Sequence, residues 1–359
     1  MLSRLKIARL VVLTLVVILL NISGCSKDKN PTKPGEVDEH LWSPLGSGTN
    51  SRVEALAVYN GQLIAAGYFT TAGGSSANRI AAWNDSSWSQ LGSGMDNYVF
   101  ALTEWSGQLI AGGYFTTAGG SSANRIAAWN GNSWSPLSSG MNNNVYALAQ
   151  FNGQLIAAGE FSNPEVGIAA WNGSSWSQLG FPGLFPPEGY ALAEFEAHLI
   201  AGGSFQIAGG IDASRVAAWN GSSWSPLSSG TNSRVEALAV YNGLLIAGGR
   251  FTTAGGVAAN YIAAWNGISW SALGSGMNNN VYALAVYDGK LIAAGEFTTA
   301  GGTSANHIAV WNGSSWFALG SGMNGRVDAL AVYNGRLIAG GEFTKAAGAP
   351  VNNIAALNN

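Results

Sequence analysis

The sequence predicts an all-β protein, a seven-bladed β-propeller built from four-stranded antiparallel blades. Three observations lead to this prediction: a repeat of about 46 residues, short apolar runs separated by turn sequences, and a chain that begins and ends part-way through a repeat. A period in this range is typical of units that bury their apolar faces only against one another. Thirteen of the fourteen tryptophans fall in two positions of the repeat, Trp42, Trp88, Trp134, Trp176, Trp224, Trp270 and Trp316 in one and Trp83, Trp129, Trp171, Trp219, Trp265 and Trp311 in the other.

Each repeat contains four apolar runs of strand length. In the sixth copy they cover residues 281–287, 290–297, 307–311 and 316–319, and we name the predicted strands a, b, c and d in that order. Asp288-Gly289 separates a from b, and Asn312-Gly313 lies between c and d. Such dipeptides between short apolar runs indicate hairpins.

The distribution of side-chain size favours a propeller over other repeat folds. The runs are apolar at nearly every position, which is typical of strands covered on both faces. Small residues such as Ala283, Ala285 and Gly295 crowd strands a and b, while the tryptophans lie in c and d. A wedge-shaped blade requires small side chains near the axis and large ones at the rim.

The two ends of the array predict a closed ring. An isolated d strand opens it at about 41–46, and the last copy stops on a c strand at about 353–358. Pairing these two strands completes the seventh blade and leaves no blade with an unpaired edge.

The repeat resembles known propeller families. Gly-Gly doublets after strand b (Gly202-Gly203, Gly248-Gly249, Gly340-Gly341) and a c–d hairpin ending in tryptophan are similar to kelch-type repeats. The fuller pattern, Ala-Leu-x-x-Tyr-x-Gly-x-Leu-Ile-Ala-Gly-Gly-x-Phe-Thr, is similar to repeats of bacterial secreted proteins and of the fungal cortical polarity-marker family. The resemblance covers about 320 residues and implies the fold, but it implies no single function, because propellers carry many.

The N-terminus predicts export and a lipid anchor. Basic residues precede an apolar run at 10–20 that is too short to span a bilayer, so residues 1–24 are interpreted as a signal peptide. Residues 22–25 resemble the bacterial lipobox, which implies lipidation of Cys25, the only cysteine; the alternative is an ordinary secretory signal beside a chance cysteine. Residues 25–40 are then a flexible tether, and 41–359 form the propeller in the bacterial cell envelope, periplasmic or on the surface.

Composition excludes several partners. Without residues 1–24, thirteen Lys and Arg face nineteen Asp and Glu, and no basic stripe remains, which argues against nucleic acid. The three histidines, His40, His198 and His307, occupy different repeat positions, and no Asp-x-Asp run suggests calcium. We therefore expect no metal, no cofactor and a monomer whose only fixed partner is the membrane, through Cys25.

No catalytic constellation stands out, so we expect a protein that is not an enzyme. The hairpin around Asp85 resembles the aspartate box of sialidases, but the other copies have glycine there, and Asn-Gly turn chemistry explains it. Glu160, Glu296 and Glu342 share one position of different blades, which indicates a repeated surface feature and not the paired carboxylates of a glycosidase.

Departures from the repeat suggest where a ligand could bind. The b–c loop of blade three is four residues shorter than its counterparts, and the following d–a loop, 180–189, is two longer. That loop carries Phe181, Leu184 and Phe185. At the second residue of strand a, copies one, five and seven have Glu or Asp, whereas copies two, three and four have Phe100, Tyr146 and Tyr190. These six residues form a candidate ligand or partner patch; the alternative is drift, with the aromatics filling the channel wall.

The resulting hypothesis is a lipid-anchored, extracytoplasmic propeller that acts as a binding or interaction module for a glycan or a protein. Two alternatives are a carbohydrate-active hydrolase or lyase, and a structural surface repeat without a dedicated ligand.

Overall fold

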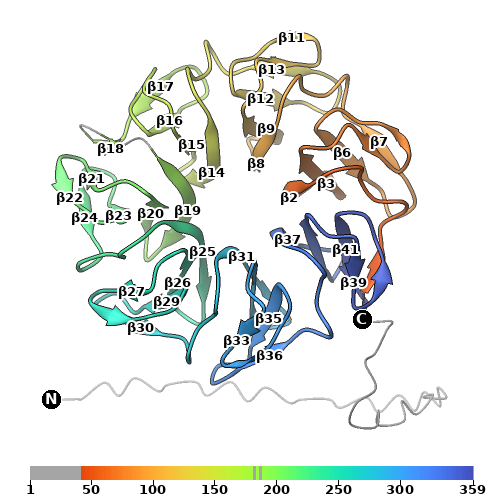
Figure 1. The fold of residues 1–359 in the computed structure, drawn as a ribbon. Coiled ribbons are helices and arrows are strands. Elements are labelled where there is room, and N and C mark those ends of the chain that lie inside the picture. The colour runs from red at the N-terminus through yellow and green to blue at the C-terminus, as the bar shows by residue number, and fades with distance from the viewer. Residues whose placement is uncertain (1–41, 181–182, 186–187, 359) are drawn as a thin grey trace, which may run out of the picture. The chain divides into compact units, whose positions relative to one another are not determined.

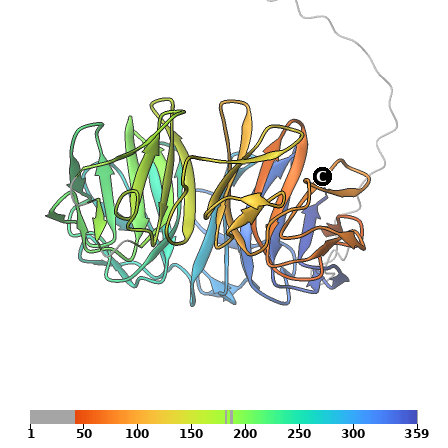
Figure 2. The ribbon, with the colours of Figure 1, turned by 90° about the horizontal axis from the view of Figure 1, so that it is seen from above.

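The computed structural model describes residues 42–180, 183–185 and 188–358. In this part of the chain there is no helix, and the strands form seven four-stranded antiparallel sheets around a central channel, as predicted (Figure 1). Strand a of each blade lies nearest the axis and strand d at the rim. Seen at right angles, the strands run between two faces on which the connecting loops gather (Figure 2).

The first four blades follow one another along the chain. Blade one comprises β2 (Val53–Tyr59), β3 (Gln62–Gly67), β6 (Ile80–Trp83) and β7 (Trp88–Gln90); blade two β8 (Val99–Trp105), β9 (Gln108–Gly113), β12 (Ile126–Trp129) and β13 (Trp134–Pro136); blade three β14 (Val145–Phe151), β15 (Gln154–Gly159), β16 (Ile168–Trp171) and β17 (Trp176–Gln178); blade four β19 (Gly189–Phe195), β20 (His198–Gly203), β23 (Val216–Trp219) and β24 (Trp224–Pro226).

The remaining blades keep the same order until the ring closes. Blade five comprises β25 (Val235–Tyr241), β26 (Leu244–Gly249), β29 (Ile262–Trp265) and β30 (Trp270–Ala272); blade six β31 (Val281–Tyr287), β32 (Lys290–Gly295), β35 (Ile308–Trp311) and β36 (Trp316–Ala318); blade seven β37 (Val327–Tyr333), β38 (Arg336–Gly341), β41 (Ile354–Leu357) and β1 (Trp42–Pro44).

The predicted closure is confirmed. β1 pairs with β41 antiparallel, with Trp42 opposite Leu357. Arg336 ties the two chain ends together, because its Nε donates to Leu357 O at 3.1 Å and its Nη2 to Ser43 Oγ at 2.6 Å. The N-terminal strand is therefore held by both backbone and side-chain hydrogen bonds.

The b–c connections are more ordered than the loops that the sequence predicts. Most fold into a two-residue hairpin: β4 (Thr71–Ala72) with β5 (Ser75–Ser76), β10 (Thr117–Ala118) with β11 (Ser121–Ser122), β21 (Ile207–Ala208) with β22 (Ile211–Asp212), β27 (Thr253–Ala254) with β28 (Val257–Ala258), β33 (Thr299–Ala300) with β34 (Thr303–Ser304), and β39 (Lys345–Ala346) with β40 (Ala349–Pro350). The short connection of blade three has no such hairpin among the described residues.

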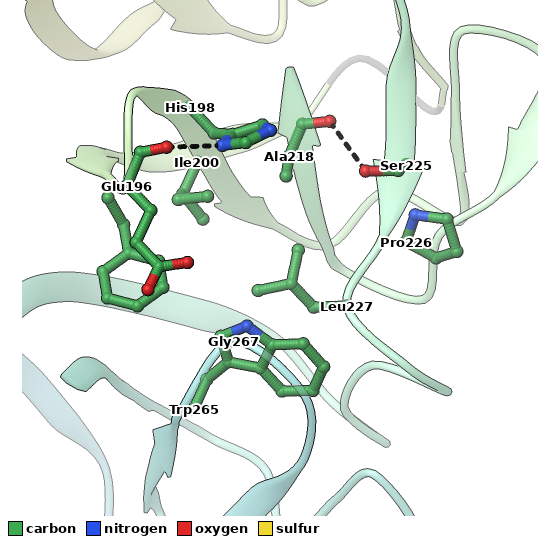
Figure 3. Close-up of a pocket in the computed structure, with 10 residues that line it drawn as sticks. Glu196, His198, Ile200, Ala218, Ser225, Pro226, Leu227, Trp265 and Gly267 are labelled. Carbon is green, nitrogen blue, oxygen red and sulfur yellow. Dashed lines mark hydrogen bonds between the residues drawn. The ribbon is translucent and has the colours of Figure 1, made fainter. Parts of the chain in front are cut away.

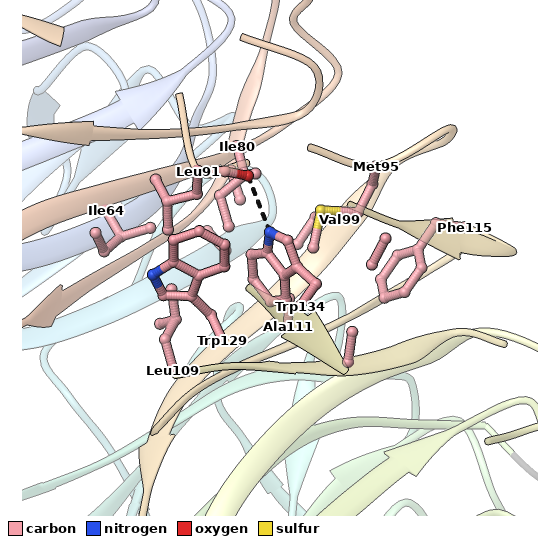
Figure 4. Close-up of a cluster of buried hydrophobic side chains, with 14 of the residues drawn as sticks. Ile64, Ile80, Leu91, Met95, Val99, Leu109, Ala111, Phe115, Trp129 and Trp134 are labelled. Atoms are coloured by element: carbon pink, nitrogen blue, oxygen red, sulfur yellow. Dashed lines mark hydrogen bonds between the residues drawn. The ribbon is translucent and has the colours of Figure 1, made fainter. Parts of the chain in front are cut away.

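The repeated tryptophans hold neighbouring blades together. Trp129 and Trp134 face each other across the c–d hairpin of blade two with ring centroids 5.3 Å apart, and both are at most 8% exposed. Trp134 Nε1 donates to Leu91 O, the last apolar residue of the preceding blade, at 2.9 Å (Figure 4). Equivalent bonds join Trp88 to Leu45, Trp176 to Leu137, Trp224 to Leu179, Trp270 to Leu227 and Trp316 to Leu273.

The closing blade departs from this scheme. Trp42 is 2% exposed, yet its Nε1 has no hydrogen-bond partner among the described residues. Its contribution to closure is therefore apolar burial, supplemented by the Arg336 bonds. The tryptophans as a set serve the packing of every blade, as their regular positions predict.

Candidate functional site

The channel opens at the face where strand a begins and strand b ends, and three residues of each blade surround this opening. They are the residue before strand a, the second residue of strand a, and the residue after strand b. A backbone hydrogen bond links the first and third in each blade, as from Tyr68 N to Arg52 O at 2.9 Å. We call the opening the channel mouth.

A cavity of about 360 Å³ occupies the channel mouth. All seven residues at the second position of strand a line it, namely Glu54, Phe100, Tyr146, Tyr190, Glu236, Tyr282 and Asp328. The cavity also meets Tyr68, Arg234, Arg250 and Arg326. Three carboxylates and three guanidinium groups therefore face a volume within the range of small-molecule sites.

Aromatic rings form one side of the mouth, along blades one to four. Tyr68 and Tyr98 have centroids 3.9 Å apart, Phe100 and Tyr146 5.3 Å, and Tyr146 and Tyr190 are stacked at 5.0 Å. Tyr146 and Tyr190 cover a face of each other, while the other neighbouring rings are tilted.

Arginines cap both ends of this aromatic arc. The guanidinium of Arg52 lies 4.2 Å from the centroid of Tyr68, and that of Arg234 lies 4.5 Å from Tyr190. Such contacts are worth about 0.5–2 kcal/mol each, depending on how well they are shielded from water.

Charged pairs complete the circle through blades five to seven. Arg250 donates to Glu236 at 2.7 Å, and Arg234 lies 3.7 Å from the same carboxylate. Arg250 and Arg326 flank the Tyr282 ring at 5.6 and 4.4 Å.

Arg326 pairs with Asp328, and Asp328 lies 3.9 Å from Arg52, where the arc begins. The mouth is thus a closed chain of contacts, aromatic on one side and ionic on the other.

Two carboxyl groups at the junction of blades seven and one have raised pKa values. Burial, together with the negative charge of Asp328, raises the pKa of Glu54 to about 7, although Arg52 and Arg326 oppose the shift. Burial also raises the pKa of Asp328, against the attraction of Arg326 and Arg52. The phenols stay neutral at physiological pH, because burial raises the pKa of Tyr146 and brings that of Tyr190 to about 12.

This carboxylate pair should make stability depend on pH. Folded Glu54 holds its proton up to about pH 7, whereas in the unfolded chain it loses it near 4.5. Since the folded state binds more protons in that window, the free energy of unfolding should fall by about 1–3 kcal/mol as pH rises from 4.5 to 7. In Glu54→Gln this part of the slope should disappear, as measured by urea denaturation across the pH range; an unchanged slope would show that Glu54 does not titrate there.

The structure brings together three of the predicted patch residues and separates the others. Phe100, Tyr146 and Tyr190 lie side by side in the channel mouth. Phe181 and Cys25 lie outside the described residues. The backbone of Phe185 pairs with Ile207 in β18 (Leu184–Phe185), next to the b–c hairpin of blade four.

Leu184 belongs to the core and not to an exposed patch. It is 0% exposed and packs in the cluster of blades three and four. It pairs with Ala208 as Met95 pairs with Ala118 in blade two, and so fills the position of that methionine. The extra loop residues hide this equivalence in the sequence, and burial explains why the position is apolar.

Several residues of the mouth escaped the sequence analysis. Tyr68 and Tyr98 extend the arc into blade one, and Tyr282 separates two arginines of the ionic half. A signal for Tyr282 was present, because Asn280-Val-Tyr282 matches Asn144-Val-Tyr146. In the described residues, no group of three His, Cys, Asp or Glu side chains could hold a metal ion.

A second, smaller cavity of about 160 Å³ lies between blades four and five (Figure 3). Phe195, Trp265 and Leu227 make its apolar walls. His198 lines it, with Nδ1 2.8 Å from Glu196 O. At the equivalent junction of blades one and two, Tyr59 Oη donates to Gly107 O at 3.1 Å. Phe195 lacks this hydroxyl and cannot make the equivalent bond.

Comparison with protein families identifies a β-propeller repeat protein. Residues 35–186 match the Rax2 C-terminal beta propeller domain, and residues 288–309 and 334–359 match a β-propeller domain of unknown function, DUF5122. No curated protein sequence matches the chain significantly. The kelch-type resemblance stays a prediction.

Solved structures agree on the fold. The computationally designed Ika8 protein has a TM-score of 0.53 at 15% identity, covering 87% of this chain and 98% of that one. The WD40 beta propeller domain of Doa1 gives 0.52 at 15%, covering 88% and 96%. The extracellular domain of a putative hybrid two component system from B. thetaiotaomicron gives 0.62 at 11%, covering 89% of this chain and 40% of that one. The described residues include no helix long and apolar enough to cross a membrane.

Proposed function

We propose that this β-propeller is an extracytoplasmic binding module that holds a saccharide in the channel mouth. The fold is a common scaffold for ligand binding and protein interaction, and a structural neighbour is an extracellular domain. One observation carries the proposal: the cavity is lined by a position at which otherwise similar repeats change between acidic and aromatic residues.

That variation contrasts with the strongly repeated positions of the chain. Residues 48–61 are identical to 230–243, and Trp and Gly positions recur in nearly every copy. The second residue of strand a is nevertheless Glu, Phe, Tyr, Tyr, Glu, Tyr and Asp in blades one to seven. Packing alone gives no reason for this, because these side chains point into an open cavity. A ligand that lacks sevenfold symmetry would explain why the seven residues differ.

The chemistry of the mouth suits a hydroxyl-rich, uncharged ligand. Each hydroxyl group both donates and accepts a hydrogen bond, and guanidinium, carboxyl and phenol groups all line the cavity. Three arginines face three acidic side chains around it, and one of these, Glu54, is half protonated near pH 7, so a net charge on the ligand gains little. The aromatic wall supplies apolar contact for the C–H groups of a sugar ring.

Replacing an aromatic residue of the arc tests this proposal. Tyr146→Ala and Tyr190→Ala should each weaken binding of a saccharide found on a glycan array by about tenfold or more, since each loses a hydroxyl and opens the stack. Phe317→Ala is the matched control, because Phe317 is half exposed on β36 at the rim. Equal binding by all three variants, or no glycan binding by the wild type, would contradict the proposal.

A carbohydrate-active hydrolase is the second candidate. The observation that favours it is the Glu54–Asp328 pair, since a carboxyl with a raised pKa is suited to act as a general acid. Both carboxyls are, however, paired with arginines. Release of product from a panel of glycosides, abolished in Glu54→Gln, would establish the enzyme.

We further propose that Cys25 carries a lipid that anchors the protein in the cell envelope. The lipobox-like residues 22–25 and the uniqueness of Cys25 support this. Wild-type protein should partition into the detergent phase of a Triton X-114 extract and Cys25→Ser into the aqueous phase. Identical partitioning of the two would contradict lipidation.

A further inference from the structure

Two polar atoms without hydrogen bonds face each other where blade seven meets blade one. Arg52 Nε and Asp328 Oδ2 are 3.9 Å apart, both buried, and neither has a hydrogen-bond partner among the described residues. The Asp328 side chain is only 2% exposed and lines the channel-mouth cavity.

Such atoms are rarely left without partners in folded proteins. Each unmade bond to a buried group is costly, and more so for a charged one. Here a donor stands beside an acceptor, at a separation that one oxygen atom can bridge. A hydroxyl group fits both, because it accepts from Nε–H and donates to Oδ2. An anion would be repelled by Asp328, and a cation by Arg52.

The arrangement is specific to this junction, although its loop is not. Residues 48–61 recur as 230–243, so Arg234 occupies the position of Arg52 in blade five. There the preceding blade presents Tyr190, and Arg234 stacks on its ring. Only blade seven presents an aspartate to the same loop, and the donor–acceptor pair results from that contact.

A third cavity, separate from the channel mouth and from the cavity between blades four and five, lies beyond Arg52. It has a volume of about 600 Å³ and follows the d–a loop of blade one and the b–c hairpin of blade seven. Hydroxyl and amide side chains, such as Ser47, Thr49, Thr344 and Asn353, form most of its lining, and its charged residues are Arg52 and Glu342. We call it the outer groove. Arg52 thus lines the outer groove and also lies next to Asp328, which lines the channel mouth.

We propose that the ligand is a neutral oligosaccharide, one hydroxyl of which bridges Arg52 Nε and Asp328 Oδ2 while the chain continues from the channel mouth into the outer groove. This inference rests on the proposed saccharide-binding function. Both atoms are closed to solvent in the structure, so binding of the hydroxyl requires the Arg52–Glu54 pair, with side chains 22% and 17% exposed, to part. Asp328 and Arg52 then select the ligand by a single hydroxyl.

Titration calorimetry on the full chain tests the inference with trisaccharides of one length. Maltotriose, cellotriose and tri-N-acetylchitotriose are neutral, trigalacturonate is acidic, and the glucosamine trimer is basic. At least one neutral trisaccharide should bind, and at least tenfold more tightly than either charged one. Asp328→Asn and Arg52→Gln should each weaken that binding about tenfold, because a charge-assisted bond becomes a neutral one. Asp212→Asn, an exposed change at the rim, should bind as the wild type does.

Monodeoxy derivatives of the bound trisaccharide give a readout that does not depend on a variant's stability. In the wild type one derivative should lose at least tenfold in affinity, since it leaves both charged groups unpaired. Asp328→Asn should discriminate against this derivative much less.

The outcomes separate the two proposals. If no trisaccharide binds the wild type, the saccharide function itself is wrong. If a neutral trisaccharide binds but Asp328→Asn and Arg52→Gln match Asp212→Asn, the bridge is wrong and the mouth function stands. Tighter binding of a charged trisaccharide overturns the neutral class. Where Asp328→Asn does not fold, Arg52→Gln and the monodeoxy series on the wild type decide.

Discussion

Replacing both Trp42 and Leu45 by alanine should lower the free energy of unfolding by about 5–10 kcal/mol, the sum expected for a buried tryptophan and a buried leucine. Both side chains are at most 3% exposed; Trp42 opens the strand that closes the ring, and Leu45 follows that strand directly. Because a domain is stable by only about 5–15 kcal/mol, most of this variant should be unfolded. Guanidinium denaturation followed by tryptophan fluorescence measures the loss.

Ser43→Ala is the matched control on the same strand. It removes only the hydroxyl that accepts from Arg336, which should cost about 0.5–1.5 kcal/mol. The double variant should also associate with itself, since β41 would present an unpaired edge. If its denaturation midpoint equals that of Ser43→Ala, closure by β1 does not stabilise the propeller.

Gly322→Ala should destabilise the protein by more than about 3 kcal/mol. Its φ is +73°, which costs an L-residue about 1–2 kcal/mol, and the added Cβ would lie 2.1 Å from Asn306 O. Since that atom belongs to the backbone, the b–c loop must shift and would break the bond from Met323 N to Asn306 O. A glycine with positive φ occupies the same position as Gly48, Gly94, Gly140, Gly230 and Gly276, and in blade four Gly183 takes this place without a positive φ.

Gly289→Ala separates strain from collision. Gly289 has φ +66°, but a Cβ there would meet nothing within 4 Å, so the change should cost only about 1–2 kcal/mol. Urea denaturation of both variants gives the comparison. If both variants lose the same free energy of unfolding, the backbone at Asn306 moves away from the added Cβ without a measurable cost.

The sequence predicts the blades well because nearly every blade is formed by one short, continuous stretch of chain. Strands a to d follow one another within about 40 residues, and their turns carry Asn-Gly or Asp-Gly, so hairpin chemistry alone defines them. Closure could also be predicted, since Trp42 and Leu357 occupy complementary positions of the repeat. The observed pairing of Trp42 with Leu357 follows from their positions in the repeat alone.

The site was less accessible to sequence reasoning because it depends on contacts between blades. Phe100, Tyr146 and Tyr190 could be found, as they break a pattern at one repeat position. Tyr68 and Tyr98 occupy two different positions, and only the ring geometry brings them together. Arg52 and Asp328 come from opposite ends of the propeller and meet only once it closes. Leu184 was misplaced because an inserted residue obscured its equivalence to Met95.

Because the channel mouth has an aromatic side and an ionic side, it also limits the orientations that a bound ligand can take. Seven equal blades would offer a bound molecule seven equivalent orientations, a degeneracy worth about 1.2 kcal/mol of entropy as RT ln 7. With aromatic rings along blades one to four and ion pairs along five to seven, those orientations are no longer equal in energy. The scaffold keeps its rotational symmetry, while the rim of the channel gives it one preferred direction.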